Sequence, residues 1–259
     1  MHPLRVPALI LSLALTAPSY ASKVCEVKSG VATAALVELY TSEGCSSCPP
    51  ADRTLNDLHR QVGPGAVVVP LALHVSYWDG IGWADVFAQK SFDARQSHLL
   101  ENQQRRVVYT PQFFVNGSEL RSWDADLPAT IRRINATPAP LAITLKSTPA
   151  TNGTVLLDVS ATAPDSRTSG ALYVAVSESG LVTQVLRGEN SGASLKHDDT
   201  VRLLFGPIQL DHGTAHLRKE VTLPTSWRRE HLQASAFVQD QSRILQAVST
   251  AQCDAPRGL

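Results

Sequence analysis

The fold prediction rests on residues 34–62, AALVELYTSEGCSSCPPADRTLNDLHRQV. Residues 34–39 are a short apolar run with a single carboxylate, which predicts a buried strand. The prolines at positions 49 and 50 are tolerated in a helix only within its first turn, so a helix is expected to begin there. Apolar residues then recur at helical spacing, at Ala51, Leu55, Leu58 and Val62. The predicted order is a strand, a Cys-x-x-Cys pair at Cys45 and Cys48, and a helix.

The residues that follow extend this pattern into an α/β domain over residues 22–137. Residues 66–75 form a valine-rich apolar run, typical of a central strand, so the strand-helix-strand unit should have a right-handed crossover. Residues 85–105 are expected to be mainly helical, with a break near Ser91. A hairpin is predicted where Asn116-Gly117 separates strands at 112–115 and 120–123, and a last helix should start near Asp124.

The composition changes after a linker at residues 137–140, TPAP. Short alternating strands separated by turn residues follow, at 141–146, 154–161, 171–177, 181–186, 201–210, 216–223, 232–239 and 244–249. Each such strand has one apolar face to cover, so an all-β sandwich is expected over residues 138–259.

The first residues predict export. Arg5 provides a weak positive charge, residues 6–17 are apolar, and Ser19-Tyr20-Ala21 is a small-x-small cleavage site. A cleaved signal peptide over residues 1–21 is expected, which would place the mature chain in the periplasm or outside the cell. An uncleaved anchor is the alternative, although the apolar run is shorter than the roughly 20 residues that a membrane span needs.

The bulk charge and the cysteines narrow the choice of partners. The formal net charge is +0 at pH 7, so no overall attraction to nucleic acid or to an anionic membrane is expected. The chain has four cysteines, and in an oxidising compartment the simplest pairing joins Cys25 to Cys253 and Cys45 to Cys48. The first of these bridges would tie the two halves of the chain together.

The Cys45–Cys48 pair is the sharpest chemical feature. At a helix start the backbone amides and the helix dipole favour a thiolate. Cys45 is therefore the expected attacking sulfur, exposed at the helix end, and Cys48 is the more buried, resolving one. The hydroxyls of Ser46 and Ser47 could donate to that thiolate and make the couple more oxidising. Two alternatives stay open: an inert structural disulfide, and half of a zinc site.

These motifs resemble two known groups. Residues 37–40, the Cys-x-x-Cys helix and Tyr109-Thr110-Pro111 before a hairpin follow the order found in thioredoxins. Residues 36–52, HVSYWDGIGW at 74–83, and 109–112 are similar to the exported bacterial family called domain of unknown function 1223, a likeness that extends through 187–190 to 237–240. The resemblance implies an α/β thioredoxin-like fold for the first domain.

The thioredoxin resemblance also assigns roles to single residues. It implies that Pro111 is a cis-proline facing the dithiol and that the Thr110 backbone pairs with an extended substrate segment. It implies that Glu38 is a buried acid that helps to deprotonate Cys48. A trans Thr110–Pro111 bond and a solvated or ion-paired Glu38 are the alternatives.

A polar and aromatic cluster follows the second predicted strand. His74 precedes Tyr77, Trp78, Asp79 and Trp83, and together these side chains could wall a cleft beside the dithiol. A histidine there could favour the thiolates or bind a metal with them. The alternative is a packed histidine among core aromatics.

The resulting hypothesis is an exported thioredoxin-like thiol–disulfide oxidoreductase that acts on protein thiols or disulfides, with an unidentified redox partner. It needs no cofactor besides the redox-active disulfide and no resident metal. One alternative is copper handling by Cys45, Cys48 and His74, although Met1 is the only methionine. Another is a β-sandwich interaction protein, in which the charged stretches 187–190 and 196–199 meet a partner or the first domain instead of lying in solvated loops.

Overall fold

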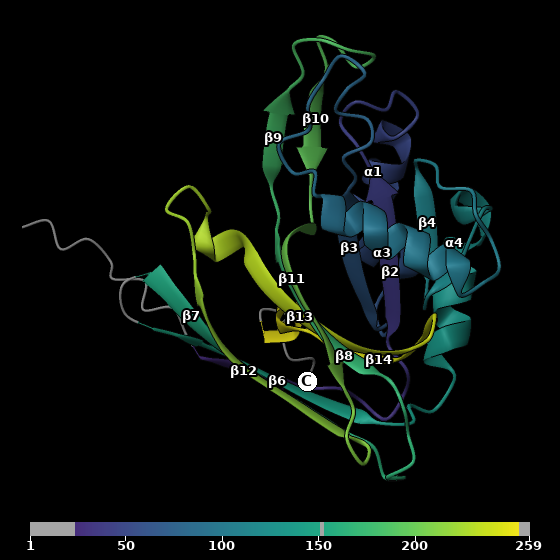
Figure 1. Cartoon of the computed structure of the whole chain (residues 1–259), viewed down its shortest axis with the longest axis vertical. Coiled ribbons are helices and arrows are strands. Elements are labelled where there is room, and N and C mark those ends of the chain that lie inside the picture. Colours follow the sequence, from purple (N-terminus) through teal and green to yellow (C-terminus); the bar gives the residue numbers. More distant parts are fainter. Residues whose placement is uncertain (1–23, 151–152, 254–259) are drawn as a thin grey trace, which may run out of the picture.

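The computed structural model describes residues 24–150 and 153–253. These residues form three β-sheets with a few helices packed against the largest of them (Figure 1). The predicted signal peptide lies outside the described residues. None of the described helices is both long enough and apolar enough to cross a membrane.

The largest sheet has eight strands in the order β14–β13–β8–β11–β3–β2–β4–β5. Their bounds are β2 Ala35–Thr41, β3 Val68–His74, β4 Gln112–Val115, β5 Ser118–Glu119, β8 Ala171–Glu178, β11 Thr200–Gln209, β13 Leu232–Asp240 and β14 Arg243–Ser249. β2 and β3 run parallel, and all 7 residues of each are buried. Burial on both faces explains why their sequences are almost continuously apolar.

Helices cover the two faces of this sheet around β2 and β3. Their bounds are α1 Pro49–Asn56, α2 Leu58–Val62, α3 Lys90–Glu101 and α4 Trp123–Asn135. On one face α1, α2 and α4 pack against Val37 and Leu39 of β2, and on the other face α3 packs against Leu36 and Tyr40. This division follows from the alternation of side chains along a strand.

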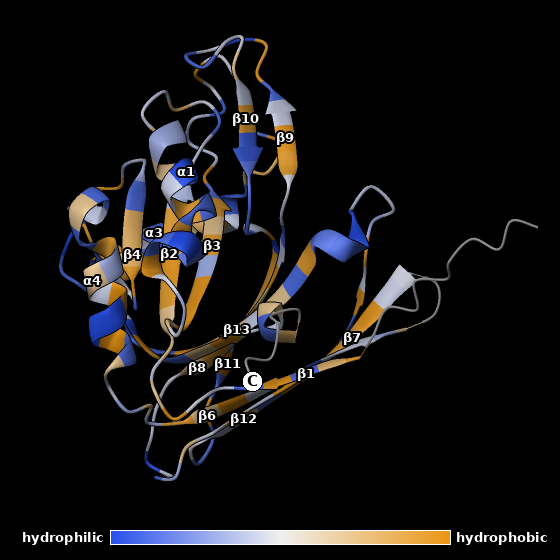
Figure 2. Cartoon of the chain, turned by 180° about the vertical axis from the view of Figure 1, so that it is seen from behind, coloured by the Kyte–Doolittle hydropathy of each residue, from blue (hydrophilic) through white to orange (hydrophobic). Residues whose placement is uncertain are grey.

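A second, four-stranded antiparallel sheet packs on the far end of the large one. It has the order β1–β6–β7–β12, with β1 Cys25–Lys28, β6 Ala142–Pro149, β7 Thr154–Thr162 and β12 Thr214–Thr222. Its apolar face meets β8, β13 and β14 in one hydrophobic core. Figure 2 shows hydrophobic residues along the strands on both sides of this core. The third sheet is a hairpin of β9 Leu181–Gln184 and β10 Ser194–His197.

The predicted α/β thioredoxin-like domain followed by a separate sandwich is wrong. The described chain is mostly strand, and one sheet contains strands from both halves. The junction is β11, where Thr200 pairs with Ala72 of β3 and the Ala72 amide donates to the Asp199 carbonyl over 2.9 Å. Periodicity predicts the faces of a strand but not its lateral neighbour, so the shared sheet could not be foreseen. The predicted division at residue 137 falls between α4 and β6, and it stays a prediction.

Several single elements also differ from expectation. The helix predicted from Pro49 is divided at Asp57 into α1 and α2, and α3 begins at Lys90 without a break near Ser91. The hairpin turn at Asn116-Gly117 is confirmed, but its second strand is only β5, and residues 120–123 lead into α4 instead. β1 (CEVK) and β10 (SLKH) were not predicted, because each contains at most two apolar residues and so gives no apolar run.

Both predicted disulfides are closed. Cys25 of β1 is bonded to Cys253, with 6.1 Å between their Cα atoms, and Cys45 is bonded to Cys48. The long bridge connects the four-stranded sheet to the 3-10 helix Thr250–Cys253, which directly follows β14 of the large sheet.

Candidate functional site

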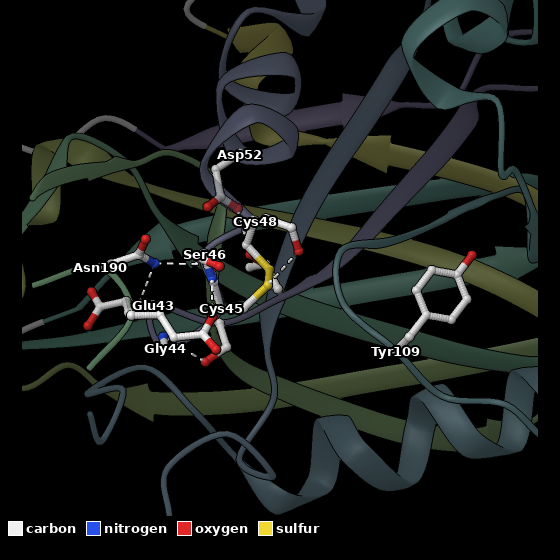
Figure 3. Close-up of a disulfide and its surroundings, with 12 residues drawn as sticks. Glu43, Gly44, Cys45, Ser46, Cys48, Asp52, Tyr109 and Asn190 are labelled. Carbon is white, nitrogen blue, oxygen red and sulfur yellow. Dashed lines mark hydrogen bonds between the residues drawn. A yellow bond between two sulfur atoms is a disulfide. The ribbon is translucent and has the colours of Figure 1, made fainter. Parts of the chain in front are cut away.

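The Cys45–Cys48 disulfide lies in the turn that joins β2 to α1 (Figure 3). The Cys45 amide donates to the Ser42 carbonyl over 3.2 Å, and the Cys48 amide donates to the Cys45 carbonyl over 3.1 Å. Cys48 directly precedes the helix, whose first two residues are prolines. Because proline has no amide hydrogen, the first turn of α1 leaves fewer unpaired donors than an ordinary helix start.

The two sulfurs are covered in this closed form. Cys45 and Cys48 are both 0% exposed, whereas Ser46 and Ser47 between them are exposed. The expectation of an exposed Cys45 sulfur is therefore wrong for the disulfide state. The Ser47 hydroxyl lies 3.3 Å from the Cys45 sulfur, which agrees with a serine placed to donate to it. The Ser46 amide donates to the Glu189 carboxylate over 3.0 Å.

Glu38 does not lie beside Cys48. It faces α3, where it accepts a hydrogen bond from the Arg95 Nε over 2.6 Å, and both side chains are buried. The next residue of β2, Leu39, faces the opposite side, which α1 covers. The structure therefore matches the alternative of a paired Glu38, and the predicted role as proton acceptor for Cys48 loses its geometric basis.

A different carboxyl group occupies the dithiol side of the sheet. Asp52 is one turn after Cys48 in α1, and its side chain accepts a hydrogen bond from the Thr41 hydroxyl over 2.7 Å. Burial raises the pKa of Asp52, although the charges of His74 and His197 and the Thr41 bond act against it. The sequence could have indicated this carboxyl group, since Asp52 is four residues from Cys48 and adjoins the apolar position Ala51.

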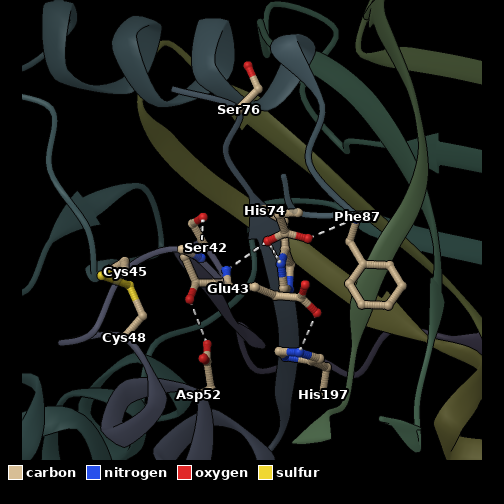
Figure 4. A network of polar contacts seen from close by, with 12 residues as sticks. Ser42, Glu43, Cys45, Cys48, Asp52, His74, Ser76, Phe87 and His197 are labelled. Carbon is tan, nitrogen blue, oxygen red and sulfur yellow. Dashed lines mark hydrogen bonds and ion pairs between the residues drawn. A yellow bond between two sulfur atoms is a disulfide. The ribbon is translucent and has the colours of Figure 1, made fainter. Parts of the chain in front are cut away.

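Behind the turn lies a buried network of two histidines and their acids (Figure 4). The His74 Nδ1 donates to Asp85 over 2.7 Å, and Asp85 also accepts the Glu43 amide over 2.9 Å. The Glu43 carboxylate in turn lies 3.1 Å from the His197 Nε2. The two imidazole rings make an edge contact with 5.0 Å between their centroids. His74 is thus a packed, ion-paired histidine and does not line an open cleft.

The network shifts the pKa values of His74 and Asp85 in opposite directions. Burial lowers the pKa of His74, but the charge and hydrogen bond of Asp85, with Asp52 and Glu43 nearby, outweigh it and raise the pKa overall. Burial raises the pKa of Asp85, but the charge and hydrogen bond of His74 outweigh it and lower the pKa. The pair is therefore held in its charged form.

The remaining predicted residues lie around the same turn. The Thr110–Pro111 bond is cis as expected, and Figure 3 places Tyr109 across from the disulfide. Trp78 is close to the turn, because a Cβ on Gly44 would be 3.4 Å from the Trp78 Cβ. The Asp79 carboxylate accepts a hydrogen bond from the Asp85 amide over 3.1 Å. This contact lies within the loop between Asp79 and Asp85 and does not involve the sulfurs.

Three residues from the second half of the chain also reach the turn. The Asn190 side-chain amide donates to the carbonyls of Glu43 and Cys45, and the Glu189 carboxylate accepts the Ser46 amide. His197 of β10 completes the buried network. The two charged stretches therefore match the alternative of contact with the first half. Their composition marked them as polar loops, but only the fold shows what they meet.

No group of three or more histidine, cysteine, aspartate or glutamate side chains is arranged to hold a metal ion within the described residues. Copper or zinc binding by Cys45, Cys48 and His74 thus receives no support from the geometry of residues 24–150 and 153–253.

Two solved structures share this fold. Protein AGR_C_4864 from Agrobacterium tumefaciens is 24% identical with a TM-score of 0.60, and the match covers 84% of this chain and 94% of that one. HBP35 of Porphyromonas gingivalis is 16% identical with a TM-score of 0.62, and the match covers 85% of this chain and 76% of that one. At such identities the likeness shows the fold alone.

No curated protein matches the chain. A family profile does match, and its description is "Protein of unknown function (DUF1223)". The matched residues, 36–239, include the dithiol turn, the buried histidine network and the hairpin that carries Glu189 and Asn190. Because the match covers most of the chain, this protein belongs to the DUF1223 family.

Proposed function

We propose that this protein is an exported thiol–disulfide oxidoreductase that exchanges its Cys45–Cys48 disulfide with thiols or disulfides of other proteins. The observation that carries the proposal is the place of this disulfide. It closes a four-residue turn directly before α1, and a buried carboxyl group, Asp52, lies one helical turn further on. Two thiols so close in the chain can form and open a disulfide without rearrangement of the fold.

The exchange balances with two protein thiols as the electron source. A client thiolate attacks the Cys45 sulfur, which forms a mixed disulfide and releases Cys48 as a thiolate. A second client thiolate then attacks the mixed disulfide at the client's sulfur. The client leaves with a disulfide, and Cys45 and Cys48 remain as thiols that have taken up two electrons and two protons. Run in reverse, the same steps reduce a client disulfide.

Asp52 is suited to handle the proton of Cys48. It is buried, it lies on the side of the sheet that α1 covers, and burial raises its pKa. A buried carboxyl group beside a thiol can accept its proton and return it later. We assign it the role that the thioredoxin resemblance implied for Glu38.

The covered sulfurs set a condition on this function. A client must displace part of the cover to reach Cys45, because both cysteines have no exposed surface in the closed form. The exposed residues Ser46 and Ser47 mark the side of the turn that faces solvent.

Export is part of the same proposal. Its support is the apolar stretch at residues 6–17 before a small-x-small site, together with two closed disulfides and no free cysteine. Disulfides persist in oxidising compartments and are rare in the cytosol.

The test is the redox equilibrium of the Cys45–Cys48 couple in the full mature chain. We expect equilibration with glutathione buffers between roughly −120 and −270 mV, followed by mass spectrometry of alkylated thiols. Cys48→Ser should trap a mixed disulfide at Cys45, and Cys45→Ser should abolish insulin reduction. The Cys25–Cys253 bridge is the internal control, because it should stay closed.

A couple that resists reduction below about −300 mV would show a structural bridge and sink the proposal. Stoichiometric copper or zinc in the purified protein, lost in Cys45→Ser, would favour metal handling instead.

A further inference from the structure

The β9–β10 hairpin brings residues from the second half of the chain to the dithiol. Figure 1 shows it projecting from the strands of the large sheet to lie beside α1. The Asn56 side-chain amide of α1 donates to the Lys196 carbonyl of β10 over 3.1 Å, which anchors the hairpin against the helix. Its loop, residues 185–193, then turns toward Cys45.

Two neighbouring loop residues form hydrogen bonds with successive backbone groups of the dithiol turn. The Asn190 Nδ2 donates to the Glu43 carbonyl over 2.9 Å and to the Cys45 carbonyl over 3.0 Å, as Figure 3 shows. The Glu189 Oε2 accepts the Ser46 amide over 3.0 Å. The backbone on both sides of the Cys45 side chain is thus held by residues far away in the sequence.

The Glu189 contact has a direct electrostatic effect on the reduced state. The Ser46 amide is the first backbone donor after Cys45, and backbone donors near a sulfur stabilise its thiolate. Glu189 occupies this donor and places a carboxylate beside it. Its hydrogen bond from the Ser46 amide lowers the pKa of Glu189, so the group is charged at neutral pH.

We propose that Glu189 and Asn190 are positioning residues that set the redox poise of the Cys45–Cys48 couple, an inference that rests on the proposed function. Glu189 disfavours the thiolate at Cys45 and so makes the couple more reducing. Asn190 holds the turn in the shape in which the disulfide is closed. The second half of the chain therefore tunes the reactive pair in the first half.

Glu189→Gln is the decisive variant, because Glu189 is exposed and glutamine keeps its shape while losing the charge. We expect the equilibrium constant for reduction of the Cys45–Cys48 disulfide to rise at least threefold, which is about 14 mV toward a more oxidising couple. The difference should shrink in 1 M salt, where the Debye length falls to about 3 Å. A purely structural role would not produce that salt dependence.

Asn190→Ala tests the second contact. We expect dithiothreitol to reduce the disulfide at least threefold faster, because the carbonyls of Glu43 and Cys45 lose their common donor. Gln184→Ala is the matched control, since the Gln184 side chain bonds only Ser194 within the hairpin. It should leave both the rate and the equilibrium constant unchanged.

The test distinguishes a failure of this inference about Glu189 and Asn190 from a failure of the proposed oxidoreductase function. The equilibrium is measured in glutathione and again in dithiothreitol, so the variant can be compared with the wild type even if the couple is too reducing for glutathione. An equilibrium constant unchanged within twofold in Glu189→Gln would overturn the inference, whatever the wild-type potential. A wild-type potential below about −300 mV would overturn the proposed function alone.

Discussion

Glu38 and Asp52 are buried carboxyl groups on opposite faces of the large sheet, and their partners separate their roles. Glu38 bonds Arg95 of α3, and Arg95 also donates to Gln239 over 2.9 Å and stacks over the ring of Phe237. Asp52 instead bonds Thr41, on the side where α1 carries the dithiol. Glu38 is thus paired on the face away from the dithiol, whereas Asp52 lies on the face that carries the dithiol.

Glu38→Gln is expected to lower the free energy of unfolding by about 3 kcal/mol, because it leaves Arg95 buried without a charged partner. The redox equilibrium of Cys45–Cys48 should not change. Urea unfolding checks the first result and a glutathione titration the second. Glu26→Gln is the matched control, since the pair of Glu26 with Lys146 is half exposed and its loss should cost less than about 1 kcal/mol. A changed redox equilibrium in Glu38→Gln would show that Glu38 does influence the dithiol.

Asp52→Asn is expected to slow the resolution of a mixed disulfide at neutral pH by at least about tenfold, because Cys48 loses its proton acceptor. Stopped-flow kinetics of insulin reduction against pH checks this. The pH dependence of the free energy of unfolding gives a second, independent readout. Since the pKa of Asp52 is raised on folding, the wild type loses stability as the pH rises above the ordinary aspartate range, and the asparagine variant should not. A pH–rate profile identical to the wild type would exclude Asp52 from the chemistry.

At the scale of elements, the β4–β5 hairpin connects the dithiol half to the β13–β14 hairpin. The Ile244 amide donates to the Asn116 carbonyl over 3.3 Å at this contact. The same hairpin carries Glu119, whose buried carboxylate fastens the segment that leads to Thr110 and Pro111. Glu119 accepts the Tyr109 hydroxyl over 2.6 Å and the Gln112 amide over 2.9 Å.

Gly117→Ala is expected to destabilise the protein by about 3 kcal/mol. Gly117 has a φ of 82°, and a Cβ there would meet the Ser242 carbonyl oxygen at 1.4 Å. Gly65→Ala is the control, because Gly65 has a similar φ of 86° with nothing within 4 Å of the added Cβ. It should cost about 1 kcal/mol for the backbone conformation alone. Equal losses in urea unfolding would show that the close approach is not what requires glycine.

Glu119 predicts an acid-dependent loss of stability. Burial raises its pKa, but hydrogen bonds from Tyr109, Gln112, Arg121 and Arg105 outweigh this and hold the pKa at about 2. Because folding lowers the pKa, Glu119 stabilises the fold at neutral pH, and this contribution is lost as the pH falls toward 2. Glu119→Gln should therefore be less stable than the wild type at pH 7, and the gap should close toward pH 2. A gap independent of pH would contradict this assignment.

At the scale of the whole molecule, one large sheet and one long disulfide unite the two halves. β11 lies beside β3, and the Cys25–Cys253 bridge joins positions separated by 228 residues. The shared sheet also explains how the β9–β10 hairpin comes to lie on the dithiol turn, since β10 is followed directly by β11. The second half is thereby part of the site and not an appended module.

Cys25→Ser with Cys253→Ser is expected to lower the free energy of unfolding by up to about 5 kcal/mol, because a bridge of this span removes much chain entropy from the unfolded state. Cys45→Ser with Cys48→Ser opens a loop of only a few residues and should cost about 2 kcal/mol. Urea unfolding of the two double variants checks the order. The reduction potential of Cys45–Cys48 should be unchanged in the variant without the long bridge. A larger loss of stability on removing Cys45–Cys48 than on removing Cys25–Cys253 would contradict the assignment of a stabilising role to the long bridge.

Local features were predictable from the sequence because they depend on neighbouring residues. The buried strands β2 and β3, the Asn116-Gly117 turn and the closed Cys45–Cys48 pair all follow from short patterns. The strand β10, SLKH, contains a single apolar residue and so shows no strand pattern of its own. Nothing local distinguishes Glu189 and Asn190 from residues of a solvated loop.

The amino-acid sequence by itself determined the buried strands β2 and β3, the start of α1 at Pro49 and the turn at Asn116-Gly117, since composition and periodicity act within a few residues. Only the tertiary structure decided that β11 borders β3, that α1 covers the face opposite Glu38, and that the Glu189–Asn190 loop holds the dithiol turn. Each of these depends on contacts between segments far apart in the chain. Such contacts form because the assembled sheet buries more apolar surface than either half could bury alone.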